Sequence, residues 1–305
     1  MSRTGEILAQ DYRSTMAPQG KEAVIKRMTD AAHDVLQKAG VELDQVGAVG
    51  VGAPGPMDAK AGILTAPPNL PGWRNVPLSE LIQARLGLPT YLENDANAAA
   101  LAEFYFGAGQ GCKNMIYVTA STGIGGGLIL NRQLYFGSNG SAGEVGHMTI
   151  LPHGPLCGCG NRGHLEALAS GTAIAREARE RMDLGVPTLI ADLVEGDPSA
   201  VTAHVVAQAA EQGDEEAERI IAEAMRFLGL GMANLANIFN PDFIVIGGGL
   251  TNLGDRMFEP VRRIVKETAF PVIAQNLQVV PAKLGSAVGV IGAATVAISR
   301  SGSSG

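Results

Sequence analysis

Apolar and polar residues recur along this chain at two spacings, which predict helices and strands in turn. Residues 21–40 have apolar positions at a spacing of about 3.6 residues and end on a glycine, which predicts a helix with a glycine C-cap. Residues 285–300 predict a final helix, and three more helices are expected between residues 170 and 240.

Short apolar runs between these helices predict strands. We expect strands at residues 5–16, 46–56 and 242–250, a strand feeding a helix at 90–109, and a hairpin with a glycine-rich turn at 114–137. Strands that alternate with helices predict an α/β fold. The glycine clusters follow strands, where the ligand loops of open α/β sheets lie.

The length of the chain predicts two lobes, and its composition disfavours several classes of partner. A chain of 305 residues is long for one core, and "GAGQG" at 107–111 suggests a boundary. A net charge of −7, without long basic runs, disfavours nucleic acid as a partner. We see neither a signal peptide nor a long uncharged apolar run, which favours a cytoplasmic protein without membrane contact. Residues 301–305 predict a flexible tail.

Three glycine-rich stretches are candidates for ligand loops. "GVGAPG" at 50–55 matches a dinucleotide-binding pattern, but Pro54 and Pro56 stand where a helix should open, so we interpret it as a turn. "STGIGGG" at 121–127 is either an anion-binding nest or a hairpin turn. "IGGGL" at 246–250 is either a close-packed strand end or a seat for a base.

Asn94 and Asp95 lie where a predicted strand ends and a helix begins. The simplest interpretation is helix capping, to which both residue types are suited. A rigid, ionised carboxylate at a helix N-terminus also suits a general base. Glu144 and His147, three residues apart, could share one face, or His147 could be purely structural.

The stretch "CGCGNRGHLE" at 157–166 contains two of the three cysteines. Three cysteines cannot form a disulfide framework, and C-x-C spacing does not match a redox pair. Cys157, Cys159, His164 and His147 would complete a closed, structural zinc shell, with His153 as a rival histidine. The competing interpretation is two inert cysteines.

Five motifs in this order resemble those of the ROK family (repressors, open reading frames and kinases). They are "PNLPGW" at 68–73, "ENDANAAALAE" at 93–103, "TASTGIGGGL" at 119–128, "GEVGH" at 143–147 and "CGCGNRGHLE". "PNLPGW" and "LEALASGTAIAREA" look most like bacterial glucokinases.

This resemblance implies the two-lobed actin/hexokinase-like (ribonuclease H-like) fold of sugar kinases. Residues 1–108 would form the small α/β lobe, completed by the helix at 285–300. Residues 109–284 would form the large lobe, which carries a zinc-stapled sugar loop.

The resemblance also implies a role for each motif. Asp95 would be the general base that takes the proton of a hexose 6-hydroxyl as it attacks ATP, with Mg²⁺ on the phosphates. The implied sugar ligands are Asn69, Asn94, Asp95, Glu144, His147 and Glu166. The implied ATP ligands are Thr122, Gly123, Gly247, Gly248 and Gly249. Zinc would be bound by His147, Cys157, Cys159 and His164, with the second nitrogen of His147 aimed at the sugar.

The chain departs from the family pattern at two places. His164 stands where the family usually has a third cysteine, so we expect a Cys₂His₂ zinc site. The family's N-terminal Asp-x-Gly-Gly-Thr phosphate loop and its two strands have no counterpart, and "MSRTGEILAQ" resembles the third strand. We therefore expect a sequence shortened at its N-terminus, whose activity depends on whether that loop is needed.

The expected function is phosphorylation of glucose to glucose 6-phosphate. Fructose, mannose, allose or an N-acetylhexosamine could replace glucose, because small pocket differences decide the choice of sugar. Polyphosphate or ADP could replace ATP as the phosphate donor. The alternative of another class is a non-catalytic sugar-binding sensor or regulator. The resemblance also implies a homodimer or homotetramer.

Overall fold

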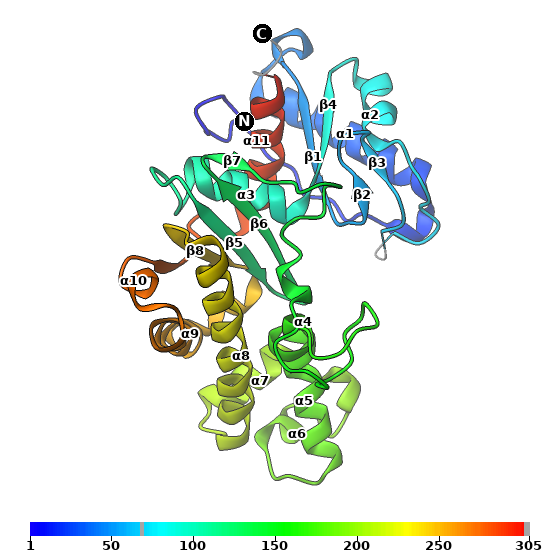
Figure 1. The fold of residues 1–305 in the computed structure, drawn as a ribbon. Coiled ribbons are helices and arrows are strands. Elements are labelled where there is room, and N and C mark those ends of the chain that lie inside the picture. Colours follow the sequence, from blue (N-terminus) through cyan, green and yellow to red (C-terminus); the bar gives the residue numbers. More distant parts are fainter. Residues whose placement is uncertain (68–69, 302–305) are drawn as a thin grey trace.

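The structure is a computed structural model that describes residues 1–67 and 70–301. The predicted sugar ligand Asn69 and residues 302–305 of the predicted tail lie outside the described residues. The first α-helix of the chain is α1 (Lys21–Ala39), which ends at Gly40 in a left-handed conformation with φ of 63°, as its sequence predicts. The elements are arranged in an upper and a lower part, joined by packed helices (Figure 1).

The lower part is built on a five-stranded mixed sheet with the order β7-β6-β5-β8-β9. These strands are β5 (Met115–Ala120), β6 (Ile124–Leu130), β7 (Gln133–Leu134), β8 (Phe243–Gly247) and β9 (Gln278–Pro281). Strands β5 and β6 form the predicted antiparallel hairpin. Strand β8 runs parallel to β5, so the carboxyl ends of β5 and β8 meet at one edge.

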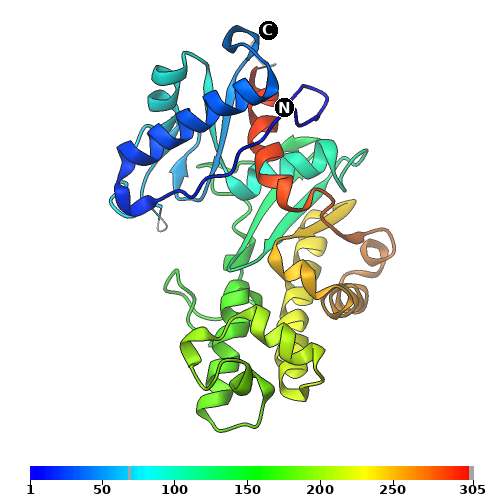
Figure 2. The ribbon, with the colours of Figure 1, turned by 180° about the vertical axis from the view of Figure 1, so that it is seen from behind.

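Alternating residues of β5 face two different layers, as strand geometry requires. Ile116 and Val118 belong to a core shared with the long helix α8 (Glu215–Phe239), whereas Met115 and Tyr117 pack toward helix α3 (Asp95–Phe106). The sheet therefore lies between α8 and α3 (Figures 1 and 2). The remaining helices of the lower part are α4 (Leu165–Ala169), α5 (Gly171–Asp183), α6 (Leu189–Leu193), α7 (Ala203–Glu211), α9 (Asp255–Thr268) and α10 (Pro271–Ala274).

The upper part has its own core beneath α1 and a parallel pair of strands. Strand β1 (Val49–Ala53) pairs with β4 (Thr90–Asn94). The other elements are β2 (Met57–Asp58), β3 (Ile63–Leu64) and α2 (Leu78–Leu86). Because β2 follows "GVGAPG" directly, this stretch is the predicted turn and not a dinucleotide loop.

The last helix, α11 (Val288–Ser301), packs at backbone distance against β1 and α3, which both lie within residues 1–108. A Cβ at Gly50 of β1 would lie 1.7 Å from the Ala293 carbonyl oxygen, and one at Gly292 would lie 2.6 Å from the backbone of Ala98. Only glycine fits at either position. This contact supports the proposal that residues 285–300 complete a small lobe of residues 1–108, beside a large lobe of residues 109–284.

Three expectations about the elements were wrong. Residues 5–16 form no strand, because the described chain offers this segment no pairing strand, and its Leu8 and Tyr12 are exposed. Ion pairs join its Asp11 to Arg13 and to Lys38 of α1.

Four helices, not three, lie between residues 170 and 240. The additional helix is the short α6, whose N-cap is Thr188. The Thr188 hydroxyl accepts a hydrogen bond from the Ile190 N–H. Ser301 ends α11 and so does not belong to the predicted tail. Among the described residues, no helix is long and apolar enough to cross a membrane.

Candidate active site

The turn from β4 into α3 presents Asn94 and Asp95. The Asn94 side-chain oxygen accepts hydrogen bonds from the N–H groups of Ala96 (2.9 Å) and Asn97 (3.3 Å), so Asn94 is the N-cap that its sequence position predicts. Asp95 is the first residue of the helix, and its side chain is exposed at the start of α3. The cap thus holds the helix start rigidly and leaves the carboxylate of Asp95 available.

Asp95 is a stronger base than an ordinary aspartate. Although its side chain reaches solvent, neighbouring protein atoms remove part of its hydration, and this desolvation raises the pKa of the carboxyl group. A hydrogen bond from the Ala96 N–H to Oδ1 (2.8 Å) acts in the opposite direction. The net upward shift is what a general base near neutral pH needs.

Two glycine loops lie side by side at the carboxyl ends of β5 and β8. Gly248 has φ of 91°, and a Cβ there would lie 2.4 Å from the Ala120 carbonyl oxygen, so glycine permits both the conformation and the contact. Among the described residues, the N–H groups of Thr122 and Gly123 have no protein acceptor. The loops therefore offer free N–H groups beside a strand end that side chains do not cover, which is a surface suited to a phosphate.

Two hydrogen bonds from the start of α5 hold the β5–β6 turn in place. The Gly171 N–H donates to the Ser121 carbonyl (2.7 Å), and the Thr172 hydroxyl donates to the Thr122 carbonyl (2.8 Å). Thr172 is a residue that the sequence interpretation missed, although it lies in the stretch that resembles glucokinases.

Four candidate metal ligands converge. The ligand atoms of His147, Cys157, Cys159 and His164 all lie within 4.8 Å of one another. Cys157 Sγ is 3.7 Å from His147 Nδ1, and Cys159 Sγ is 3.2 Å from His164 Nδ1. Two thiols and two imidazoles at these separations fit a tetrahedral Zn²⁺ site without an open position. His153 does not belong to this group.

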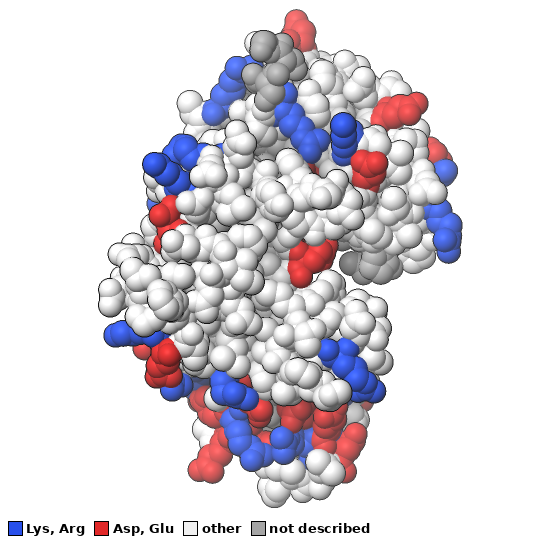
Figure 3. All heavy atoms as spheres, in the orientation of Figure 1, with Lys and Arg blue, Asp and Glu red and all other residues white. Residues whose placement is uncertain are grey.

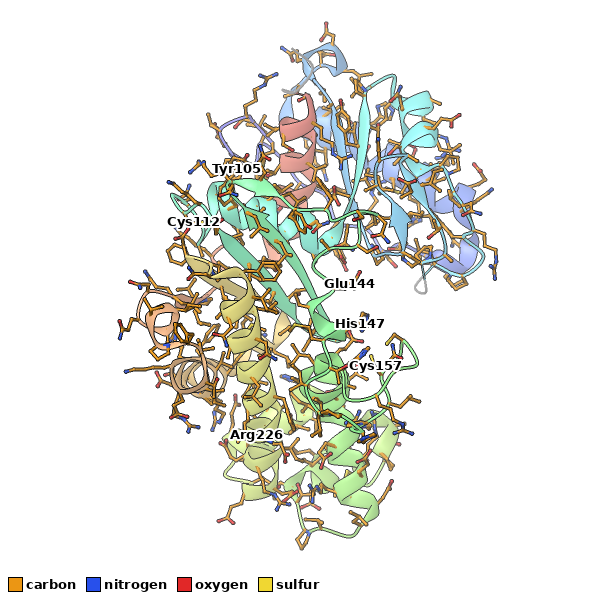
Figure 4. All side chains as sticks on the ribbon, viewed as in Figure 1. Tyr105, Cys112, Glu144, His147, Cys157 and Arg226 are labelled. Carbon is orange, nitrogen blue, oxygen red and sulfur yellow. The ribbon has the colours of Figure 1, made fainter. Side chains whose placement is uncertain are left out.

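His147 faces two ways, as a shared zinc and sugar ligand would. Its Nδ1 lies toward Cys157, and its Nε2 lies 3.9 Å from a carboxylate oxygen of Glu144. Figure 4 shows Glu144, His147 and Cys157 near one another between the sheet and α4. Glu144 is largely exposed, so its carboxylate is open to a ligand.

Glu166, in the first turn of α4, links the metal group to the glycine turn. One carboxylate oxygen accepts from the Ile124 N–H (3.0 Å), and the other lies 3.7 Å from Cys157 Sγ. A cavity of about 250 Å³ opens here, lined among others by Gly123, Cys157 and Glu166. On the face drawn in Figure 3, a hollow with acidic side chains at its inner edge lies between the upper and lower parts.

The structure brings the glycine turn and the cysteine–histidine group together through Glu166, and it presents Asn94 and Asp95 at the β4–α3 turn. The sequence interpretation missed Glu93, which immediately precedes Asn94 and is 1% exposed. Its one signal was that it is the only charged residue in strand β4. No feature of the sequence pointed to Arg300, which pairs with Glu93.

A comparison with protein families matches residues 1–300 to the ROK family. Among curated proteins, a glucokinase of Thermotoga maritima is 38% identical over 302 residues, covering 99% of this chain and 93% of the relative. A xylose repressor of Caldicellulosiruptor bescii is 32% identical and covers 97% of this chain, but the match covers only 73% of the repressor.

Two solved structures of ROK family proteins also match this chain. The ROK hexokinase from Thermus thermophilus matches with a TM-score of 0.81 and 35% identity, over 97% of this chain and 92% of that one. A ROK family glucokinase from Streptomyces griseus, in complex with glucose and AMPPNP, matches with a TM-score of 0.80 and 35% identity, over 96% and 92%.

Proposed function

Because this chain belongs to the ROK family and has its two-lobed actin/hexokinase-like sugar-kinase fold, we propose that it transfers the γ-phosphoryl group of ATP to the 6-hydroxyl of glucose. The observation that carries the proposal is the exposed Asp95 carboxylate, with its raised pKa, on a capped helix start. The 38% identity to a glucokinase over nearly the full chain supports glucose as the hexose.

In the proposed reaction, Asp95 accepts the proton of the 6-hydroxyl as that oxygen forms a bond to the γ-phosphorus. The bond from this phosphorus to the leaving oxygen of ADP breaks in the same displacement. Asn94 fixes the helix start, so the carboxylate does not need to reorganise during the reaction. A binding protein would have no need for a base at this position.

The sugar and the nucleotide are assigned to two adjoining groups of residues, which meet where Glu166 binds the Ile124 N–H beside the glycine turn. Asn94, Glu144, His147 and Glu166 are proposed to bind the sugar hydroxyls, and so is Asn69, which lies outside the described residues. Thr122 and Gly123 would donate N–H groups to phosphate oxygens. The flat strand end at Gly247, Gly248 and Gly249 would lie against adenosine. Mg²⁺ would neutralise charge on the phosphates when ATP is bound.

We assign a structural role to zinc at His147, Cys157, Cys159 and His164. The set is closed, so the metal has no coordination position for substrate or water. It would order the loop that carries His147 and lies against Glu166, and thereby the sugar side of the pocket.

We propose that the protein is a cytoplasmic enzyme that acts on small molecules and has no nucleic-acid or membrane partner. The net charge of −7 supports the first exclusion, because phosphate backbones attract basic surfaces. The family membership supports assembly as a homodimer or homotetramer.

The second candidate function is sugar sensing without catalysis, which the 32% identity to a xylose repressor favours. The two functions differ in turnover. The test is glucose 6-phosphate formation by this chain with glucose, ATP and Mg²⁺, compared with mannose, fructose, xylose and N-acetylglucosamine. We expect glucose to be the preferred acceptor. Tight glucose or xylose binding without any product would favour the sensor and contradict the kinase.

A further inference from the structure

A partly buried ion pair lies directly behind the proposed catalytic turn. Arg300, in the last turn of α11, donates from Nη2 to a carboxylate oxygen of Glu93 at 2.6 Å. The Glu93 side chain is 2% exposed and the Arg300 side chain 28%. The two residues are 207 positions apart in sequence, so the pair joins the end of the described chain to the end of β4.

The other oxygen of Glu93 acts on the turn itself. It accepts hydrogen bonds from the Asn94 N–H (3.0 Å) and from the side-chain amide of Asn97 (3.1 Å). Asn94 in turn accepts from the N–H groups of Ala96 and Asn97. Asp95 is therefore held between residues whose backbone or side chain is bound within one hydrogen-bond network.

Arg300 is itself fixed at two points. Its Nη1 donates to the Ala59 carbonyl at 3.3 Å, while Nη2 is bound to Glu93. The helix that carries it cannot shift easily, since Gly50 and Gly292 admit its backbone at distances that leave no room for a Cβ. The guanidinium is thus delivered by a rigid element.

We propose that Glu93 and Arg300 are positioning residues for Asp95: the C-terminal helix neutralises Glu93 and so keeps the Asn94–Asp95 turn in its working orientation. This inference rests on the proposed kinase function. Neither residue touches substrate in it. Without Arg300, Glu93 would be a buried charge without its cation, and the turn would shift to let water reach it.

The test compares Arg300→Met, Arg300→Lys, Glu93→Gln and the double variant Glu93→Gln/Arg300→Met. Glutamine keeps an acceptor for Asn94 and Asn97 but carries no charge. Arg256→Met is the matched control, because Arg256 also binds one carboxylate, Glu218 (2.7 Å), and one backbone carbonyl, but on the surface and away from the turn.

We expect Arg300→Met to lower kcat roughly tenfold to a hundredfold with KM for glucose within about threefold, because small misplacements act on the reacting geometry. Glu93→Gln should restore much of this loss in the double variant, since it removes the stranded charge. If Arg300→Met does not fold, Arg300→Lys takes its place in the test. Its kcat should lie between those of wild type and the double variant Glu93→Gln/Arg300→Met. A double variant as slow as Arg300→Met, or unchanged kcat in Arg300→Met itself, would overturn the inference.

A second readout is independent of turnover. Hydrogen exchange followed by mass spectrometry should show faster exchange of the Asn94, Ala96 and Asn97 amides in Arg300→Met, with α8 unchanged as the internal reference. Wild-type protein without hexose phosphorylation would refute the proposed function alone, and the exchange would still report on the turn. Unchanged exchange at these three amides would overturn the positioning role even in an active kinase.

Discussion

The glycine loop after β8 offers a sharp prediction, because the Gly248→Ala variant has a matched control. Gly248 and Gly213 have nearly the same positive φ, 91° and 88°. A Cβ at Gly213 would meet no atom within 4 Å, whereas one at Gly248 would lie 2.4 Å from the Ala120 carbonyl oxygen and 2.7 Å from its carbon. Both alanine variants place a side chain at a positive φ, and only Gly248→Ala adds a collision with a backbone that cannot rotate away.

The magnitudes follow from these two terms. A non-glycine residue in such a conformation costs about 1–3 kcal/mol, which we expect for Gly213→Ala. Overpacking a close contact adds about 1–3 kcal/mol, so Gly248→Ala should lose roughly 2–6 kcal/mol of unfolding free energy in urea. Because the collision pushes the loop away from β5, the affinity for an ATP analogue should fall too, with glucose affinity nearly unchanged.

Urea unfolding gives the first quantity, and calorimetric titration with the nucleotide and with glucose gives the second. Gly213→Ala should keep wild-type affinity for both ligands. Equal losses of stability in the two variants, or wild-type nucleotide affinity in Gly248→Ala, would refute the reasoning about this loop.

Three further predictions follow from the site. Elemental analysis should find one zinc per chain in wild type and in His153→Ala, but none in His164→Ala, which should also melt at a lower temperature. Zinc retained in His164→Ala would contradict the ligand assignment. Because the pKa of Asp95 is raised in the folded protein, its contribution to stability is present below the ordinary aspartate pKa and is lost as pH rises through the raised pKa. Asp95→Asn should therefore be more stable than wild type at neutral pH and equally stable in acid, with Asp255→Asn as the control. An Asp95→Asn variant less stable than wild type at pH 7 would contradict the raised pKa. Burial raises the pKa of Tyr117 to about 12. In a spectrophotometric titration, Tyr117→Phe should therefore lose the tyrosine ionisation that occurs at the highest pH and keep the others. Loss of an ionisation at lower pH would contradict this burial.

Local chemistry made much of the site predictable. Asn94 and Asp95 stand at a strand–helix junction, and capping preferences alone place them there. The two cysteines and two histidines of the metal group lie within eighteen residues of sequence, so their convergence needs one loop and no long-range packing. The choice of His164 over His153 was beyond the pattern, because His153 has φ of 65° in a turn and its side chain joins no metal group.

Non-local contacts explain what the sequence could not predict. Residues 5–16 carry strand-forming side chains, but a strand exists only where another strand pairs with it, and pairing is not encoded in the segment itself. Helix α6 depends on Asp214, whose carboxylate accepts from the Thr188 hydroxyl across 26 positions. The Glu93–Arg300 pair depends in the same way on the placement of α11, which only the assembled core determines.

The most direct test of the central claim is a comparison of wild type with Asp95→Asn in two assays on the same preparations: glucose binding by calorimetry and glucose 6-phosphate formation with ATP and Mg²⁺. Loss of a general base reduces turnover by about 10²–10⁴-fold while leaving the other sugar contacts in place. We predict that Asp95→Asn binds glucose within about tenfold of wild type and forms product at least a hundredfold more slowly. Product formation by Asp95→Asn at a rate near that of wild type would contradict the assignment of Asp95 as the base.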